Sequence, residues 1–256
     1  MRRYSCDLHI HSTLSPCASL EMSPGNIVRR AREVGLDIVA ITDHNMVENA
    51  LYAYESAGDD APLVLFGMEL HTMEEIHVLV LFDEWDTARD FQNTIYNLLP
   101  DVKNDPAYFG DQVVVDAHDE IVRFEDRLLL TAAQIPLGTA VSMVKSKGGL
   151  VIPSHIDSPT FSIISQLGFV PDDIPFDALE VIDRKRVHDI CPTIGPKDFA
   201  FVTFSDAHYL NEIGRRRINL QMEDASLAEI GRALQRLRSR TRQGTQGPAG
   251  VREHGE

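Results

Sequence analysis

Two histidines near the start of the chain, His9 and His11, are separated by a single residue and follow a short apolar segment. In a β-strand, residues i and i+2 point to the same side, so the two imidazoles would be directed toward one point at the strand end. Imidazole nitrogens are ligands for Zn²⁺, Mn²⁺ and Fe²⁺. Taken alone, the pair is equally compatible with two ordinary polar residues at the end of a strand. A metal site is favoured because the pattern recurs along the chain.

Other residues with ligating side chains also follow apolar segments of strand length. They are His44, Glu69, His155, Asp206 and His208, and His77 opens a further segment of this kind. In α/β barrels and open α/β sheets, the carboxyl ends of the parallel strands face the active site, so these side chains are expected to converge. These candidate ligands are more numerous than a single ion needs. A shared carboxylate such as Glu69 would let two ions lie about 3.5–4 Å apart, as in two-metal hydrolytic sites.

The elements that must position these residues alternate between strands and helices. Residues 4–8 and 36–41 predict strands, and Ser23-Pro24 predicts the start of a helix that ends at Gly35. This strand–helix–strand unit implies a parallel pair of strands. Further helices are predicted over 46–58, 85–99, 129–146 with a break near 136–138, and 226–238, and further strands over 63–66, 77–82, 150–153, 178–182 and 199–204. The pattern predicts an α/β fold.

Two parts of the chain depart from this alternation. Glu69 and His77 are too close for a crossover helix between their strands, which predicts an antiparallel hairpin. Residues 112–116 and 120–124 flank a polar turn and predict a small solvent-facing hairpin, so that about 100–128 forms an excursion from the main fold. We expect a single domain over 1–240 and a disordered tail over 241–256, which is rich in glycine, glutamine and charge.

The composition is that of an ordinary soluble protein, with 256 residues, 43% hydrophobic and 25% charged. Three unclustered cysteines argue against a disulfide framework and favour a reducing, cytoplasmic location. We expect neither a secretory signal nor a membrane span. The formal net charge of −15 disfavours non-specific binding of long nucleic acids. It remains compatible with an anionic substrate, because bound cations would reverse the local charge.

A set of ordered motifs resembles those of the PHP (polymerase and histidinol phosphatase) superfamily of metal-dependent phosphoesterases. The motifs are Asp7-Leu-His-Ile-His-Ser12, Ile41-Thr-Asp-His-Asn45, Gly67-Met-Glu69, His77, Ser154-His155 and Ser205-Asp-Ala-His208, and the resemblance extends over about residues 4–220. It implies a distorted, TIM-barrel-like (β/α)₇ barrel with two or three divalent metal ions.

The resemblance also implies how the ligands are shared. His9, His11, Glu69 and Asp206 would hold the first ion, Glu69, His77 and His155 the second, and His44 and His208 a third, with a residue from the loop after His11. Many members have an aspartate in that loop, whereas this chain has Ser15-Pro16-Cys17-Ala18. Cys17 could replace the aspartate as a thiolate, which would favour Zn²⁺ or Fe²⁺. Alternatively, Cys17 is an ordinary loop thiol and the third site is weak.

The implied reaction is hydrolysis of a phosphate mono- or diester by a hydroxide that bridges the metals. His44 or His208 would protonate the leaving oxygen if the third ion is absent, and Asp43 would orient a ligand imidazole. Candidates for binding the substrate phosphate are Arg184, Lys185 and Arg215, which are otherwise solvated surface charges.

The substrate class stays open among a nucleotide, an oligonucleotide end and a small phosphorylated metabolite. Two other functions are a catalytically idle metal-binding module that serves a partner protein, and a metal-dependent C–N hydrolase on a similar barrel. Four histidines lack the strand-end context and are predicted to lie on the surface, namely His71, His118, His188 and His254. Cys6 and Cys191 are predicted to be packing residues.

Overall fold

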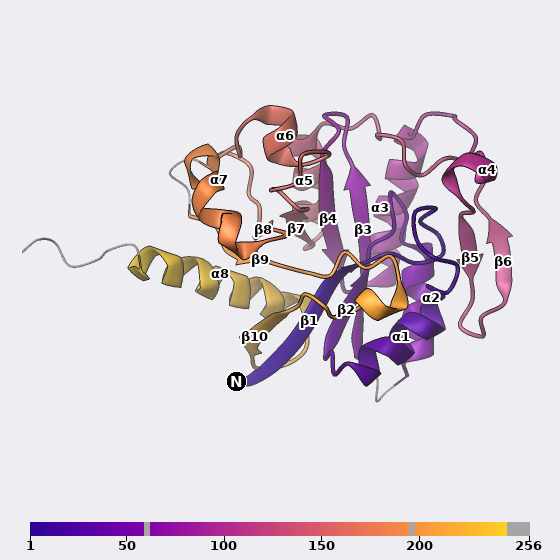
Figure 1. Ribbon diagram of the computed structural model, residues 1–256, viewed down its shortest axis with the longest axis horizontal. Helices are drawn as coiled ribbons and strands as arrows, with labels where there is room; N and C mark the ends of the chain where they lie inside the picture. Colours follow the sequence, from indigo (N-terminus) through magenta and orange to yellow (C-terminus); the bar gives the residue numbers. More distant parts are fainter. Residues whose placement is uncertain (59–61, 195–197, 245–256) are drawn as a thin grey trace, which may run out of the picture.

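A computed structural model of the protein describes residues 1–58, 62–194 and 198–244. Its centre is a curled six-stranded sheet with the strand order β10-β1-β2-β3-β4-β7 (Figure 1). These strands are β1 (Arg2–Ile10), β2 (Ile38–Ile41), β3 (Leu63–His71), β4 (His77–Phe82), β7 (Leu150–Pro153) and β10 (Ile218–Met222). The α/β class expected from the sequence is confirmed, and β10 is a strand that the sequence pattern did not predict.

The strands that carry the amino-terminal motifs run parallel, as predicted. β1 pairs with β2 and β2 with β3 in parallel register. The connection from β1 to β2 contains α1 (Pro24–Glu33), where the side chain of Ser23 accepts a hydrogen bond from the backbone N–H of Asn26. β3 and β4 pair in antiparallel register, which confirms the predicted hairpin. The carboxyl ends of β1, β2 and β3 therefore lie at one edge of the sheet.

Two short strands, β8 (Leu179–Glu180) and β9 (Phe201–Val202), form a separate parallel pair. The backbone N–H of Ile156, just after β7, donates to the carbonyl oxygen of Glu180 at 2.8 Å. On the other side, the N–H of His11 donates to the carbonyl oxygen of Ala207 at 3.0 Å. The β8–β9 pair thus joins the end of β7 to the end of β1, and the arrangement resembles a TIM barrel.

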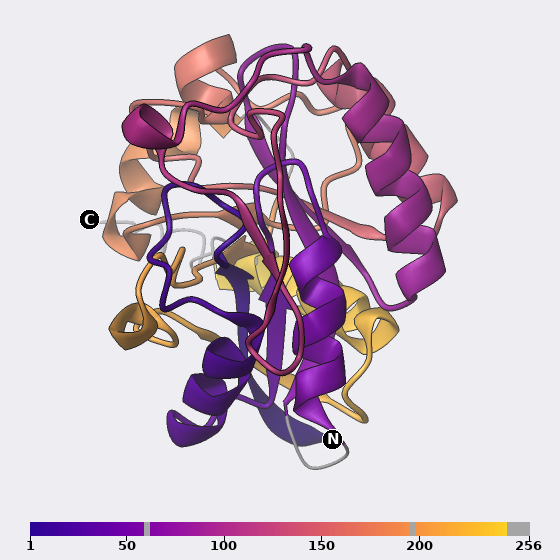
Figure 2. The same cartoon turned by 90° about the vertical axis from the view of Figure 1, so that its right-hand side faces the viewer.

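Both faces of the sheet are buried. One hydrophobic cluster contains Val39, Val64 and Phe66 and packs against α1, α2 (Glu48–Ala57), α3 (Trp85–Leu98) and α5 (Leu137–Ser146). Figure 2 shows α2 and α3 covering this face. The other cluster contains Tyr4, Cys6 and Leu8 together with residues of α8 (Leu227–Gly244). The predicted packing role of Cys6 is confirmed, whereas the side chain of Cys191 lies outside the described residues.

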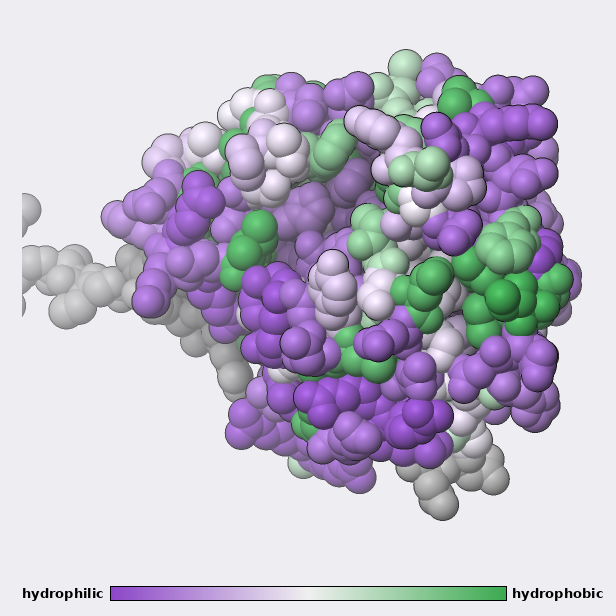
Figure 3. All heavy atoms as spheres, turned by 45° about the vertical axis from the view of Figure 1, so that its right-hand side comes forward, coloured by the Kyte–Doolittle hydropathy of each residue, from purple (hydrophilic) through white to green (hydrophobic). Residues whose placement is uncertain are grey.

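A hairpin of β5 (Val113–Val115) and β6 (Ile121–Phe124) stands beside the sheet, as the sequence predicted (Figure 1). β5 is buried, and the N–H of Val113 donates to the carbonyl oxygen of Thr13 at 2.8 Å, which fixes the hairpin to the loop after β1. β6 is exposed, and Figure 3 shows apolar side chains gathered on this side of the molecule. A one-turn helix, α4 (Pro106–Phe109), precedes the hairpin.

The remaining elements refine the predicted boundaries. The helix expected over 129–146 begins only at Leu137, because residues 129–136 form an irregular segment that ends at Pro136. The other helical elements are α6 (Ile163–Leu167), α7 (Val187–Ile194), and the 3₁₀ turns η1 (Arg184–Arg186) and η2 (Leu210–Glu212). α8 continues to Gly244, so the first residues of the predicted tail are helical, and residues 245–256 lie outside the described part. None of the helices in the described segments is long and apolar enough to cross a membrane.

Candidate metal centre

Glu69, near the carboxyl end of β3, lies at the centre of the converging side chains. Its carboxylate is buried, with 2% of the side chain exposed. Oε1 lies 3.3 Å from Nε2 of His9, 3.3 Å from Nδ1 of His77 and 3.2 Å from Nε2 of His155. Oε2 lies 3.2 Å from Nδ1 of His44 and 3.4 Å from Nε2 of His11. One carboxylate thus faces imidazoles from four different segments of the chain.

The four residues that the sequence assigned to a first ion lie together. Oδ1 of Asp206 is 3.3 Å from Nε2 of His9 and 3.4 Å from Nε2 of His11, and the two imidazole nitrogens are 3.3 Å apart. Glu69 completes this group. The i and i+2 positions on β1 and the segment after β9 therefore meet as the strand-end rule predicted.

The second predicted group is present with one addition. His77 and His155 both face Oε1 of Glu69, and Nδ1 of His44 lies within the same cluster of potential ligand atoms as Glu69 and His77. His44 had been predicted for the third ion only. Its two ring nitrogens face opposite ways, since Nε2 lies 3.5 Å from Sγ of Cys17.

The third group consists of His11, Cys17, His44 and His208, whose potential ligand atoms all lie within 4.8 Å of one another. The Nδ1–H of His208 donates to the backbone carbonyl oxygen of Asp206 at 3.0 Å, which leaves Nε2 free to act as a ligand. The thiol of Cys17 therefore lies beside His44 and His208, and His11 belongs to the same group.

The geometry of these groups fits divalent ions. Metal–ligand bonds of about 2.0–2.2 Å place neighbouring nitrogen and oxygen ligands roughly 3–3.5 Å apart. The measured separations around Glu69 are 3.2–3.4 Å. Oε1 of Glu69 and Nδ1 of His44 are buried and have no hydrogen-bond partner in the described part of the chain. A buried, unpartnered polar atom is costly unless something else, such as an ion, interacts with it.

Glu180, on β8, is a supporting residue that the sequence analysis missed. It is 2% exposed. The Nδ1–H of His9 donates to Oε2 of Glu180 at 3.0 Å, and the backbone N–H of His155 donates to the same oxygen at 3.1 Å. A carboxylate on Nδ1 fixes the tautomer so that Nε2 of His9 carries the lone pair and faces the ligand group.

Asp43 acts on His11 through a serine rather than directly. Oδ1 of Asp43 accepts a hydrogen bond from the hydroxyl of Ser15 at 2.6 Å, and Ser15 Oγ in turn lies 2.9 Å from Nδ1 of His11. Asp43 also accepts from the backbone N–H of Ser12 at 2.7 Å. It is fully buried and does not line the cavity, which places it beneath the ligand groups.

Burial and neighbouring charges shift the pKa values of these residues strongly. Burial lowers the pKa of His44 well below its usual range, and burial together with His11 lowers that of His208 to about 4. Burial also opposes the charged form of His9, but Glu180, Asp206 and Glu69 outweigh it and raise the pKa of His9 well above the usual range. Burial acts against ionised Glu69, yet His77 and His9 hold its pKa well below normal. The centre thus combines an ionised carboxylate with two kinds of imidazole. His44 and His208 are neutral and offer lone pairs, whereas His9 holds a proton that a bound ion would have to displace.

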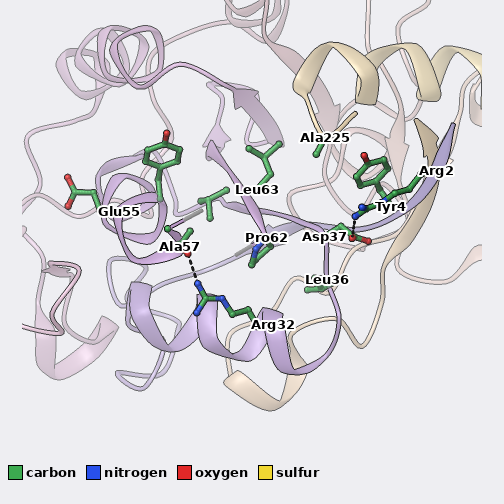
Figure 4. Close-up of a pocket in the computed structure, with 13 residues that line it drawn as sticks. Arg2, Tyr4, Arg32, Leu36, Asp37, Glu55, Ala57, Pro62, Leu63 and Ala225 are labelled. Atoms are coloured by element: carbon green, nitrogen blue, oxygen red, sulfur yellow. Dashed lines mark hydrogen bonds and ion pairs between the residues drawn. The ribbon is translucent and has the colours of Figure 1, made fainter. Parts of the chain in front are cut away.

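These groups open into a cavity of about 330 Å³. One wall is formed by the ligand residues and the other by apolar side chains, with Leu130, Phe161 and Ile182 among them. A larger hollow of about 870 Å³ contains no such group (Figure 4). There Arg2 forms an ion pair with Asp37 at 2.9 Å, and Arg32 donates to the carbonyl oxygen of Ala57.

The basic residues predicted to bind phosphate lie outside the cavity lining. Arg184 donates to the carbonyl oxygen of Phe201 at 3.0 Å, and Arg215 donates to that of Ser205 at 3.2 Å. Lys185 is exposed. Their role in substrate binding stays a prediction.

The histidines predicted to lie on the surface divide into three cases. His118 and His188 are exposed, as expected, and His254 lies outside the described residues. The prediction for His71 is wrong, because it is only 5% exposed and lines the cavity. It points inward because the irregular segment 129–136 covers it.

A sequence-family model described as PHP domain matches residues 7–135. No curated protein matches the chain. Among solved structures, the lesion-specific endonuclease PfuEndoQ from Pyrococcus furiosus has a TM-score of 0.69 and 18% identity, covering 91% of this chain and 56% of that one. Endonuclease Q bound to a 27-mer duplex with an abasic lesion at the active site has a TM-score of 0.62 and 18% identity, covering 91% of this chain and 57% of that one.

An amidohydrolase from Chromobacterium violaceum, solved with bound sulfate and no metal, has a TM-score of 0.52 and 14% identity, covering 91% of this chain and 96% of that one. These likenesses show a shared fold. This chain spans only a little over half the length of the two endonuclease chains, with 56% and 57% covered.

Proposed function

The chain belongs to the PHP domain family, and we propose that it is a metal-dependent phosphoesterase that hydrolyses a phosphate mono- or diester. The observation that carries this proposal is the position of Glu69, whose two carboxylate oxygens face separate sets of imidazoles at 3.2–3.4 Å. A carboxylate placed in this way is suited to bridging two ions.

The residues present would hold two or three divalent ions, with zinc, manganese and iron as candidates. His9, His11, Glu69 and Asp206 would bind the first, Glu69, His77 and His155 the second, and His44, His208 and Cys17 the third. Such ions lower the pKa of a water molecule and neutralise charge on the phosphoryl oxygens.

The chain's own residues have distinct tasks in this proposal. Glu180 and the Asp43–Ser15 pair hold the imidazoles of His9 and His11 in the ligating tautomer. His208 lines the cavity, and it or His44 is proposed to protonate the leaving oxygen where no third ion is bound. Because burial lowers the pKa of both imidazoles, each would first have to take up a proton when the anionic substrate binds. Arg184, Lys185 and Arg215 would attract the substrate phosphate from the rim.

Seven strands, β1 to β4 and β7 to β9, are proposed to make up the distorted (β/α)₇ barrel within one domain of residues 1–240. The hydrogen bonds from Ile156 to Glu180 and from His11 to Ala207 support this closure. A cytoplasmic location remains a proposal, supported by the unclustered cysteines.

The substrate is proposed to be a nucleotide, an oligonucleotide end or a small phosphorylated metabolite. A cavity of about 330 Å³ suits a small group or a single nucleotide unit. The similarity to endonuclease Q, solved with a duplex that carries an abasic lesion, favours a nucleic-acid phosphodiester, whereas the net charge of −15 argues against extensive binding of a long polyanion. A C–N hydrolase is the second candidate, because an amidohydrolase shares the fold. A catalytically idle metal-binding module that serves a partner is the third.

Elemental analysis of protein purified without chelator, combined with assays on phosphate esters and cyclic amides, tests these candidates. Two or more ions per chain with phosphate release would support the phosphoesterase, and cleavage of amides alone would support the C–N hydrolase. Bound ions without turnover on either panel would favour the idle module. Fewer than one ion per chain after reconstitution would contradict all three.

A further inference from the structure

A buried imidazole beside the metal centre has one ring nitrogen without a partner. His71, at the end of β3, is 5% exposed and lines the cavity. Its Nε2 is buried and has no hydrogen-bond partner among the residues that the structure describes. His71 is also absent from each described group of ligand atoms that could hold an ion. Neither the candidate metal groups nor the contacts of the fold give this nitrogen a partner among the described residues.

Every other polar atom of His71 is engaged. The backbone N–H donates to the side-chain oxygen of Asn45 at 2.9 Å, and the backbone carbonyl oxygen accepts from the N–H of Ala133 at 2.8 Å. In the ring, Nδ1 lies 3.1 Å from the carbonyl oxygen of Leu130. Because a carbonyl oxygen can only accept, Nδ1 carries the proton and Nε2 carries a lone pair. The ring is therefore held as a hydrogen-bond acceptor.

Asn45, whose side-chain oxygen accepts from the backbone N–H of His71, also holds the segment that covers His71. Asn45 has φ of +53°, and its side-chain NH₂ donates to the carbonyl oxygens of Leu129 and Thr131 at 2.8 and 2.9 Å. It thus ties the segment that covers His71 to the loop that carries His44. A left-handed backbone at a non-glycine residue costs free energy, and such strain clusters at functional sites.

Phe161 encloses the acceptor from the side of the cavity. Its ring stacks on His77 with a centroid separation of 4.8 Å and an interplanar angle of 5°, and meets His71 edge-on at 5.2 Å. Phe161 also has a left-handed backbone, with φ of +54°, and its carbonyl oxygen accepts from the N–H of His77 at 2.8 Å. Phe161 is 40% exposed and lines the same cavity as His71, so its ring has room to turn away from His71.

We propose that His71 determines substrate specificity, with Nε2 accepting a hydrogen bond from a hydroxyl or amino group of the leaving group and Phe161 packing against the adjoining carbon atoms. This inference rests on the proposed phosphoesterase function. His71 belongs to the wall next to His77, one ring away from the side chains that face Glu69. The donor would therefore lie a few bonds from the scissile phosphate.

Because Nε2 of His71 accepts a hydrogen bond, it would select substrates that carry a hydrogen-bond donor at this place. An ester without a donor at this place would leave Nε2 buried and unpaired, which costs about 1–3 kcal/mol, and a protein site built around such a bond discriminates strongly against the analogue that lacks it. Polyol, sugar and amino-alcohol phosphates satisfy the requirement, and simple alkyl phosphates do not.

Matched ester pairs test this inference. Ethyl, propyl and butyl phosphate are compared with 2-hydroxyethyl, 3-hydroxypropyl and 4-hydroxybutyl phosphate, by kcat/KM and by calorimetric binding to the metal-loaded protein. We expect at least one hydroxylated ester to be preferred by about tenfold or more. The chain length with the greatest preference reports how far Nε2 lies from the phosphate.

Variants of His71 test whether its ring nitrogen causes the preference for hydroxylated esters. His71→Phe keeps an aromatic ring without an acceptor and should abolish the preference, while His71→Gln keeps an acceptor and should retain part of it. His118→Phe, at an exposed histidine of the hairpin, serves as the control and should behave as the wild type. Circular dichroism and metal content verify that each variant is folded and loaded.

The outcomes are distinct from those for the proposed function. If none of these esters is hydrolysed, the binding comparison still decides the role of His71, and the phosphoesterase proposal is decided separately by metal content and the wider panel of phosphate esters. A wild type that binds and cleaves both members of every pair equally would overturn the inference. So would a preference that is unchanged in folded, metal-loaded His71→Phe.

Discussion

Glu180 accepts a hydrogen bond from His9 Nδ1 at 3.0 Å, although the two residues are 171 positions apart in the chain. The contact joins β8 to β1 and aligns one imidazole with the carboxylate of Glu69. Carboxylates that hold a ligand histidine contribute to metal affinity without touching the metal.

Replacing Glu180 by alanine is therefore expected to weaken metal binding by about 10- to 100-fold while the barrel stays folded. Glu180→Gln should cost less, because its side-chain oxygen can still accept from Nδ1. Titration with a metal buffer measures the affinity, and Glu55→Gln, at an exposed glutamate on α2, is the control. Unchanged affinity in Glu180→Ala would show that the contact is purely structural.

His9→Ala should abolish turnover and lower the metal content. It removes a ligand that faces both Glu69 and Asp206 at 3.3 Å. The loss should appear in elemental analysis, with little change in the circular dichroism spectrum. His118→Ala gives the matched control at an exposed position. Wild-type metal content and turnover in His9→Ala would rule out the ligand assignment.

Cys17 should bind the third ion as a thiolate. Loading the protein with Co²⁺ is expected to produce a thiolate-to-metal charge-transfer band that disappears in Cys17→Ser, because Sγ lies 3.5 Å from Nε2 of His44. Cys17 is exposed as a residue, but its thiol faces the buried imidazoles. Desolvation of the thiol there and the charge of Glu69 raise its pKa to about 12, so binding of the ion has to displace the thiol proton. Cys17→Asp should bind manganese in preference to zinc relative to the wild type. A cobalt spectrum that is identical in Cys17→Ser would remove Cys17 from the centre.

Gly110→Ala should disturb the loop that carries Cys17. Gly110 has φ of +99°, and an added Cβ would collide with the carbonyl oxygen of Pro16. We expect loss of the third ion with the other two retained, which elemental analysis can count. Gly148→Ala isolates the backbone strain, because Gly148 has φ of +78° and no atom within 4 Å of the added carbon. Equal metal content in both variants would show that the contact with Pro16 does not matter.

Removing the ions should lower thermal stability. Ions that bind only the folded chain stabilise it by about 2.7 kcal/mol at a concentration 100 times Kd, which corresponds to roughly 5–10 °C in Tm for a protein of this size. Differential scanning calorimetry with and without chelator measures the change, and a chelator already saturated with the metal found by elemental analysis is the control. A Tm that is the same under both conditions would mean that the centre holds no ion in the native protein.

The sequence was sufficient to predict the histidines at strand ends, because alternation along a strand and the parallel arrangement are local properties. Two features were missed because they depend on contacts between distant parts of the chain. Glu180 lay inside the predicted strand 178–182, whereas β8 ends at Glu180, and only the fold shows that its partner is His9. His71 was assigned to the surface because it lacked the strand-end context in the predicted strand 63–66, whereas β3 extends to His71. The strand β10 was missed although Ile218, Leu220 and Met222 alternate with polar residues, which is typical of a strand with one buried face.

The proposed ligands of the first ion are distributed over almost the whole chain, and this affects when the centre could form. Asp206 follows His9 by 197 positions. During synthesis at about 5–20 residues per second, roughly 10–40 s pass between the two. A nascent chain therefore exposes His9 and His11 long before the acid that completes their site leaves the ribosome. Metal is expected to enter the finished protein, and fragments released early should be metal-free.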